Sequence, residues 1–346
     1  MNRKIRRVGY FFLYFAIGIL YLAPCLFSLD DNTQDKYPSL DQPRPIQVQP
    51  ADDPRGDKFS IVPSVDIQAG YDNNVELSPS RFKDGFFQNI FSVPAEYQVC
   101  DDLSLEFGVD LFDTLYLKYN RNNILDVMPY AGFRWQFAEN TYFSLDCSFD
   151  YLKYPNYKEN DYLAFEVRPS VRQYVAEGVY HEAGYKSVSR HYPDSKAYMS
   201  DGAMGNSDRS DIVNEADYTI GCSLGGATML KLANVVSVND SNDMYQDYYD
   251  SSSYGIKPSF THYFTEKFYV HGEFISKLRS FDDRRATDND DKTVTENTLT
   301  YTGSCYYNLT RSVSVNISFS YKENYPNDPF YKYSGLVVSS GMYFEF

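Results

Sequence analysis

Apolar and polar residues alternate along this chain from Phe59 to its end. The alternation is clearest in the last run, where small or polar residues occupy one parity and apolar residues occupy the other, namely Leu336, Val338, Met342, Phe344 and Phe346. A period of two predicts a β-strand with one apolar face and one polar face. The terminal run therefore predicts a strand that ends on an aromatic residue.

Similar runs recur through the chain. Their apolar residues mark fourteen predicted strands, at 61–71, 91–99, 103–111, 125–137, 143–151, 163–171, 179–191, 212–224, 230–238, 254–264, 268–278, 299–307, 313–321 and 336–346. The run at 179–191 has the weakest pattern, because neither of its parities is cleanly apolar. Strands of about ten residues match the length that a tilted membrane crossing requires.

Short and long connections alternate between these strands. The short ones fall at 101–102, 138–140, 176–178, 225–227, 265–267 and 309–311, and the longer ones at about 73–86, 119–123, 155–160, 192–210, 239–252, 282–293 and 323–332. Outer-membrane barrels separate short periplasmic turns from longer extracellular loops, whereas a soluble sandwich has no reason to do so. The pattern predicts an all-β fold with a single transmembrane, antiparallel, up-and-down β-barrel of about 14 strands over residues 59–346.

Composition is compatible with this fold. The 346 residues include 34 Tyr and 25 Phe, yet the mean hydropathy is only −0.48. A barrel combines many aromatic residues with a hydrophilic average because its strands are apolar on one face only. A soluble all-β domain can have the same totals.

The amino terminus has the layout of a secretory signal peptide. Basic residues from Arg3 to Arg7 precede an apolar stretch at 8–24, which predicts a signal peptide over residues 1–25, with cleavage possible as late as residue 28. The alternatives are a lipoprotein anchored at Cys25 and an uncleaved membrane anchor. Residues 26–58 are rich in Pro and polar residues, which predicts a disordered periplasmic leader.

Three features together resemble a known group of proteins. They are the motif Gly70-Tyr71-Asp72-Asn73-Asn74-Val75, the tyrosine-rich repeated strands and the terminal aromatic residue. Over residues 59–346 they resemble the β-barrel porins of Gram-negative-type envelopes. The resemblance implies a place in the outer membrane and contact with lipopolysaccharide. It also implies assembly by the barrel-assembly machinery, with Tyr343, Phe344 and Phe346 as the assembly signal.

If the apolar parity faces lipid, the charged residues of the other parity face the lumen. The candidate pore-lining residues are Asp66, Glu96, Glu106, Asp110, Asp126, Arg134, Asp146, Asp150, Glu166, Arg168, Arg172, Glu273, Lys277 and Arg279. Carboxylates dominate the first five strands, and Lys and Arg are more frequent in strands six to eleven. Two interpretations follow: opposed charged walls that orient polar solutes in water, or charges that pair across the lumen and close it.

Other chemistry has weaker support. His271 and Glu273 share a face, but no serine motif accompanies them, so we expect no enzyme and no catalytic residues. Acidic loops around Asp240–Asp250 and 282–291 lack the spacing of a calcium loop, so we expect solvated charge and neither metal nor cofactor. Cys147, Cys222 and Cys305 fall on the lipid-facing parity of strands that are not neighbours, which predicts free thiols.

The predicted function is an outer-membrane channel for passive or weakly selective diffusion of small polar or charged solutes. The alternatives are an export barrel for a polysaccharide or a surface protein, and a structural surface protein with a closed lumen. The formal net charge is −15, and removal of the signal peptide takes away four basic residues and no acidic ones. A chain this acidic is not expected to bind nucleic acid, whose phosphates require Lys and Arg.

Overall fold

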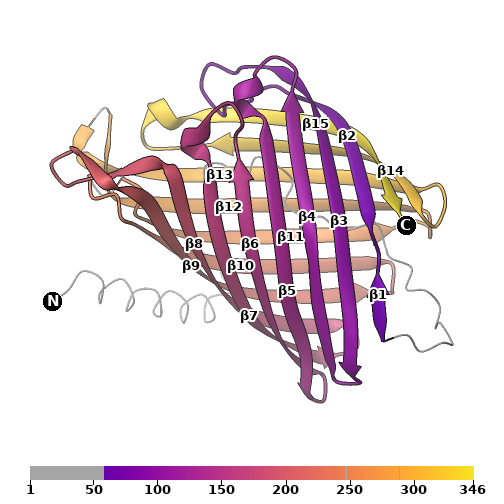
Figure 1. Ribbon diagram of the computed structural model, residues 1–346. Coiled ribbons are helices and arrows are strands. Elements are labelled where there is room, and N and C mark those ends of the chain that lie inside the picture. Colours follow the sequence, from indigo (N-terminus) through magenta and orange to yellow (C-terminus); the bar gives the residue numbers. More distant parts are fainter. Residues whose placement is uncertain (1–57, 246–247, 288) are drawn as a thin grey trace.

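The computed structural model describes residues 58–245, 248–287 and 289–346. The predicted signal peptide and almost all of the predicted leader lie outside these residues. In the part of the chain that is described, no helix has the length and apolar character needed to cross a membrane. The described chain consists almost entirely of one antiparallel sheet (Figure 1).

The sheet curls into a tilted barrel in which strands follow one another around the wall. Its first strands are β1 (Phe59–Ile61), β2 (Ser64–Asp72), β3 (Asp84–Cys100), β4 (Leu103–Tyr116), β5 (Ile124–Ala138), β6 (Thr141–Lys153) and β7 (Tyr162–Ala176). The others are β8 (Val179–Tyr198), β9 (Met204–Leu224), β10 (Thr228–Ser241), β11 (Ser251–Tyr263), β12 (Phe268–Ala286), β13 (Asn289–Asn308), β14 (Val313–Asn324) and β15 (Tyr333–Glu345). Short 3₁₀ turns occupy the connections at Asn120–Asn122, Lys158–Asn160 and Pro329–Tyr331.

The first and last parts of the chain close the barrel. Strand β2 pairs with β15 from Ser64 opposite Glu345 to Asp72 opposite Val337. The N–H of Phe346 then donates to the carbonyl of Pro63 at 2.9 Å. Strands β1 and β2 both pair with β3, one after the other along its length, so together they count as one strand of the barrel. The result is the predicted closed barrel of 14 strands, with no free edge.

The two ends of the barrel differ, and we call them the turn end and the loop end. The predicted short connections form the turn end. Between β9 and β10, for example, Gly225 and Gly226 both have positive φ angles of 59° and 72°. Two consecutive left-handed residues make the type of turn that matches the twist of a hairpin, and glycine adopts this conformation without a steric penalty.

At the loop end, two predicted loops are mostly strand. Residues predicted as loops at 192–210 and 282–293 instead extend the hairpins β8–β9 and β12–β13. Strand β8, which has the weakest sequence pattern, is one of the longest in the barrel. Apolar alternation fails there because Val188 is buried on the inner face, whereas Ser187 and Ser189 lie on the outward parity.

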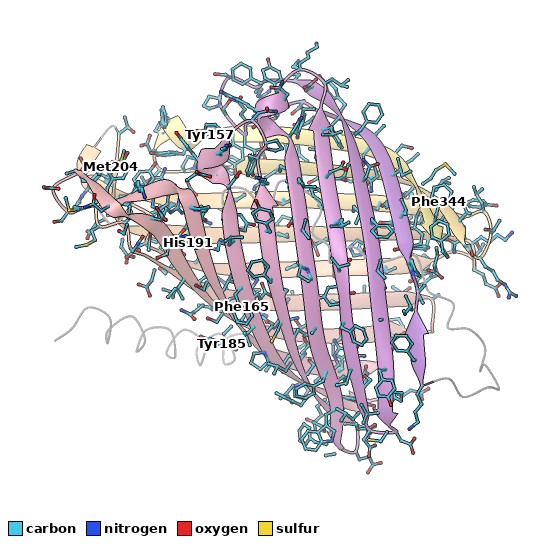
Figure 2. The ribbon with its side chains drawn as sticks, in the orientation of Figure 1. Tyr157, Phe165, Tyr185, His191, Met204 and Phe344 are labelled. Carbon is cyan, nitrogen blue, oxygen red and sulfur yellow. The ribbon has the colours of Figure 1, made fainter. Side chains whose placement is uncertain are left out.

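The outer face carries the apolar parity, as predicted. Large hydrophobic side chains such as Phe165 and Tyr185 are exposed on the outside of the wall (Figure 2). The four cysteines in the described residues are free, and Cys147, Cys222 and Cys305 share this outward parity. The prediction of free thiols on the outer face is therefore confirmed.

The inner face is not uniformly polar, which corrects the sequence-based picture. Toward the loop end it carries buried apolar residues in three clusters. The largest joins six neighbouring strands, with Ile124, Leu152, Tyr154, Tyr162, Ala164, Val188 and Val213 packed against Phe112 and Tyr192. The second contains Val75, Phe86 and Tyr116, and the third contains Phe281, Ala286 and Val294. Side chains thus fill the lumen wall at the loop end, where burial of apolar surface stabilises the fold.

An arginine surrounded by aromatic rings joins the loops at this end. The Arg284 guanidinium lies 4.1 Å from the ring centroids of Tyr248 and Tyr331 and 4.5 Å from that of Phe281. It also donates to the Tyr248 hydroxyl at 2.7 Å. Three connections therefore meet at one buried cation, and we call this group the Arg284 cluster.

A buried carboxylate, that of Asp328, joins two of these connections. Asp328 is buried and accepts hydrogen bonds from the N–H groups of Thr287 and Phe330 at 2.6 and 2.9 Å. Burial alone would raise the pKa of Asp328, but these hydrogen bonds outweigh it and lower the pKa. The charged carboxylate thus ties the β12–β13 connection to the β14–β15 connection.

The alternation makes a prediction about two adjacent positions on β6. With all other cysteines replaced by Ser, native Cys147 should not react with a charged thiol reagent, because it faces lipid in the reconstituted protein. A cysteine introduced by Asp146→Cys, in the Cys147→Ser background, should react, because position 146 faces water. Mass spectrometry measures the modification, and a faster reaction at 147 than at 146 would contradict the register of β6.

The Arg284 cluster makes a second prediction. Arg284→Ala removes a buried cation from three aromatic faces, each worth about 0.5–2 kcal/mol. Chymotrypsin should then cleave the β10–β11 loop at least about tenfold faster, because a loss of 1.4 kcal/mol raises the population of the open loop tenfold. Arg285→Ala is the matched control, since Arg285 is exposed and its ion pair with Asp283 is 3.9 Å long. Equal cleavage of the two variants would show that Arg284 does not secure the loop.

Candidate binding site in the barrel lumen

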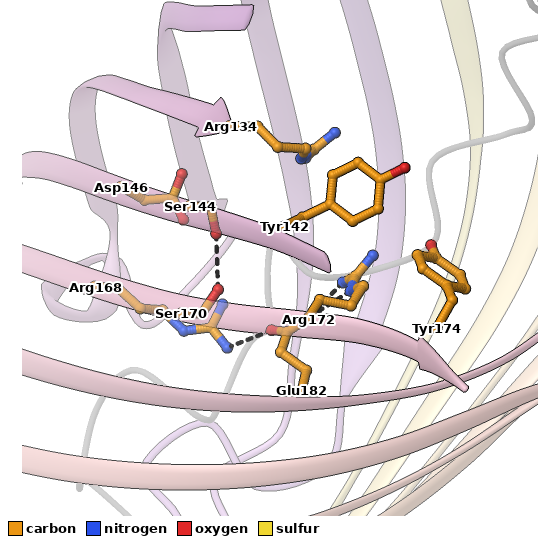
Figure 3. Close-up of a pocket in the computed structure, with 9 residues that line it drawn as sticks. All are labelled: Arg134, Tyr142, Ser144, Asp146, Arg168, Ser170, Arg172, Tyr174 and Glu182. Carbon is orange, nitrogen blue, oxygen red and sulfur yellow. Dashed lines mark hydrogen bonds and ion pairs between the residues drawn. The ribbon is translucent and has the colours of Figure 1, made fainter. Parts of the chain in front are cut away.

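One pocket on the inner face opens toward the turn end of the lumen. It has a volume of about 350 Å³ and is lined by residues from β5, β6, β7 and β8 (Figure 3). The lining residues all belong to the inward parity and are Arg134, Tyr142, Ser144, Asp146, Arg168, Ser170, Arg172, Tyr174 and Glu182. Its size is at the lower end of the range for small-molecule sites.

Strand register brings opposite charges to this pocket. Asp146 of β6 lies directly opposite Arg168 of β7, and Arg172 lies opposite Glu182 of β8. Cross-strand partners of opposite charge attract each other at such short separation. Arg134 of β5 instead points back to Glu106 of β4, at 3.2 Å.

Glu182 orients the two arginines of β7. Its side chain is only 10% exposed, and its two oxygens accept separately from Arg168 at 3.5 Å and from the Nε of Arg172 at 2.7 Å. Arg168 is shared further with Asp217 of β9, at 3.3 Å. The guanidinium groups of Arg168 and Arg172 nevertheless keep side-chain exposures of 36% and 40% toward the lumen.

Two inward-facing glycines make room for the carboxylates. A Cβ on Gly132 would lie 2.7 Å from an oxygen of Asp146, and a Cβ on Gly184 would lie 2.5 Å from an oxygen of Asp217. Both distances are too short for a real contact. The carboxylates therefore lie over bare backbone, which keeps them close to the wall and leaves the pocket open.

Polar and aromatic side chains complete the pocket wall. The hydroxyls of Ser144 and Ser170 hydrogen bond across β6 and β7 at 2.7 Å. Tyr142 and Tyr174 meet edge to face, with ring centroids 5.9 Å apart. Tyr180 stacks under Arg172, whose guanidinium carbon lies 4.7 Å from the ring centroid. Stacking of this kind holds the arginine side chain in one direction.

Four of the fourteen predicted pore-lining residues meet in this pocket: Arg134, Asp146, Arg168 and Arg172. Glu106 adjoins it through Arg134. The inward tyrosines and serines were not predicted as site residues. Their only sequence signal is their parity, which they share with many residues that line no pocket.

The other predicted residues lie elsewhere on the inward parity. Asp110, Asp150, Lys277 and Arg279 are less than 10% exposed, so they belong to the filled part of the wall and not to an open surface. Asp126 and Glu166 are half-buried, and Glu96 is exposed opposite Glu106. The carboxylate of Asp66 accepts a hydrogen bond from Gln68 at 2.9 Å, and Glu273 forms an ion pair with Lys257. Glu296 and Lys322 are buried inward charges that the prediction missed.

Several inward charges form ion pairs between neighbouring strands. Examples are Lys186–Glu215 at 3.3 Å, Lys257–Glu273 at 3.2 Å and Arg279–Glu296 at 4.0 Å. The part predicted to be basic is therefore largely balanced by carboxylates on the next strand. These pairs run along the wall of the barrel.

His271 and Glu273 were the residues considered for catalysis. The Nδ1 of His271 is 3.0 Å from the hydroxyl of Thr261, which hydrogen bonds with it. Within the described ranges, no three His, Cys, Asp or Glu side chains converge in a way that suits a metal ion. Asp243 and Asp250 of the predicted acidic loop are buried and accept hydrogen bonds from the backbone, so they are not simply solvated.

Comparison with known proteins bears on the fold alone. No family model and no curated protein matches the chain. Among solved structures, it is similar to OmpT, an outer-membrane protein of Vibrio cholerae, with a TM-score of 0.50 and 10% identity over 83% of this chain and 97% of that one.

Two further structures are more distant. They are an anion-selective porin from Comamonas acidovorans, with a TM-score of 0.44 and 8% identity over 83% of this chain and 99% of that one, and a FadL homologue of Pseudomonas aeruginosa, with a TM-score of 0.46 and 8% identity over 83% and 90%. The similarity to OmpT, at 10% identity, shows the β-barrel fold alone.

The close approach at Gly184 makes a prediction. Gly184→Val should push the Asp217 carboxylate away from the wall and weaken its ion pair with Arg168, with an overpacking cost of about 1–3 kcal/mol. Folded barrels migrate faster than unfolded ones in denaturing gel electrophoresis without boiling. The midpoint temperature at which the variant changes from the fast band to the slow band should fall. Ala183→Val is the matched control, because Ala183 is exposed on the outward parity. Equal midpoints would contradict the packing at Gly184.

Proposed function

We propose that this protein is an outer-membrane channel through which small polar or charged solutes diffuse. The observation that carries the proposal is an open, charged pocket inside a closed barrel whose outside is apolar. Guanidinium groups with 36–56% of their side-chain surface exposed require water around them, which a solid barrel core does not offer. Such groups in a confined space attract and orient polar solutes.

The outer surface supports placement in an outer membrane. Its exposed apolar residues would face lipid, and its loops would meet lipopolysaccharide. The terminal strand supports recognition by the barrel-assembly machinery, with Phe344 and Phe346 on the outward parity and Phe346 76% exposed. Tyr343 faces inward, where its hydroxyl donates to Glu345 at 3.2 Å. Signal-peptide cleavage before residue 26 belongs to the same proposal.

One observation favours a second candidate, a structural surface protein with a closed lumen. The three apolar clusters and the Arg284 cluster pack side chains tightly at the loop end. A barrel filled at one end would conduct little, whatever its pocket binds. Conductance separates the two functions, because only the channel passes ions between the two sides of a bilayer.

The test is single-channel recording of the full-length protein in planar bilayers under a salt gradient. The channel function predicts discrete conductance steps. Replacement of both arginines of β7, Arg168→Gln with Arg172→Gln, should raise the cation-to-anion permeability ratio roughly twofold or more, and high salt should reduce the effect by screening. A control with Lys267→Gln and Arg311→Gln removes the same charge from exposed turns and should produce a smaller shift.

Two results would count against this proposal. Absence of conductance in correctly folded protein would favour the closed structural barrel. Unchanged reversal potentials in a conducting double variant would show that ions do not pass Arg168 and Arg172.

A further inference from the structure

The pocket in the lumen wall contains arginine side chains that are held in place but still have N–H donors exposed to the lumen. Arg134 makes one ion pair, with Glu106, among the residues that the structure describes, and 56% of its side chain is exposed. Arg172 directs its Nε to Glu182 and lies over the ring of Tyr180, yet 40% of its side chain is exposed. A guanidinium has five N–H donors in a fixed plane, so both arginines keep donors for a ligand carboxylate.

A carboxylate, that of Asp146, lines the same pocket and lies on its Arg168 side in Figure 3. Asp146 is exposed on the inward parity, and within the described chain its carboxylate makes no hydrogen bond and no ion pair within 4 Å. The neighbouring Gly132 has no side chain to cover it. Asp146 is therefore an acceptor that is built into the wall and left open to the lumen.

Aromatic faces adjoin these charges. Tyr174 is 37% exposed and meets Tyr142 edge to face at the turn-end side of the pocket. In Figure 3 the ring of Tyr142 lies between Arg134 and Arg172. Tyr142 is four residues from Asp146 on β6, so the rings border the end of the pocket that holds the arginines.

We infer that this pocket binds a small zwitterion, a molecule with one carboxylate and one ammonium group, such as an α-amino acid. The carboxylate is held by Arg134 and Arg172, and the ammonium group by Asp146. The inference rests on the proposed function only in that the ligand reaches the pocket through the lumen.

The other charge classes fit the pocket less well. A simple anion would use the arginines but would leave Asp146 without a partner and repelled by the ligand's charge. A simple cation would use Asp146 but would meet three guanidinium groups. Only a ligand that carries both charges satisfies donors and acceptor together, as complementary binding requires.

The test uses three ligands that share the glutamine side chain and differ in the charged groups they carry. L-glutamine is a zwitterion, N-acetyl-L-glutamine lacks the ammonium group, and L-glutamine amide lacks the carboxylate. Calorimetric titration of the full-length folded barrel in detergent should show saturable binding of L-glutamine, with at least tenfold weaker binding of the other two. Equal binding of all three ligands, or tighter binding of N-acetyl-L-glutamine, would overturn the inference, as would the absence of saturable binding.

Substitutions then assign the two ends of the ligand. Asp146→Asn should weaken L-glutamine at least tenfold and leave N-acetyl-L-glutamine unchanged or slightly tighter. Arg134→Gln should weaken both ligands that carry a carboxylate. Glu139→Gln and Arg311→Gln remove the same charges from exposed turns outside the pocket and should change neither affinity. Loss of both carboxylate ligands in Asp146→Asn would reject the assigned ammonium contact.

The outcomes separate this inference from the proposed function. Selective binding of L-glutamine without conductance in bilayers would support the pocket and reject the channel. Conductance without selective binding would do the reverse. The comparison of three ligands on the unaltered protein does not depend on whether any variant folds.

Discussion

The pairing of β2 with β15 is the constraint on which the rest of the structure depends. A strand in a lipid environment has no water to satisfy its backbone N–H and C=O groups, so an open edge is very costly there. Closure between Ser64–Asp72 and the terminal strand removes that edge. It also fixes which parity faces outward at every position, because successive side chains on a strand alternate between the two faces.

Closure alone leaves the inner face free to vary along the barrel, and here it varies strongly. The loop end is filled by apolar clusters and by buried charges such as Lys277 and Arg279. Toward the turn end, glycines at 132 and 184 and partly exposed arginines leave room for water. A single fold therefore combines a packed half, which carries much of the stability, with a hydrated half, which carries the candidate site.

Ion pairing along the wall explains how so many charges are tolerated inside the barrel. Several pairs join adjacent strands, so partners such as Lys257 and Glu273 are held close together by the register. The pocket differs from the rest of the wall because its charged groups are not matched one to one. Glu182 serves two arginines, whereas Asp146 has no hydrogen-bonded partner among the described side chains. A bound ligand can supply the hydrogen-bond donor that Asp146 lacks.

The sequence by itself determined the barrel, the strand number, the separation of short turns from long loops and the parity of each strand. These follow from local patterns, because alternation and turn residues report the environment of each strand directly. It did not determine that 192–210 is mostly strand, that Asp110 and Asp150 are buried, or that Arg134 meets residues of β7 and β8. Those features depend on the stagger between strands and on how the loops pack at the end of the barrel, which only the tertiary structure decides. The parity of a residue specifies the face of the sheet on which it lies, but not its position along the barrel axis or its neighbours on other strands.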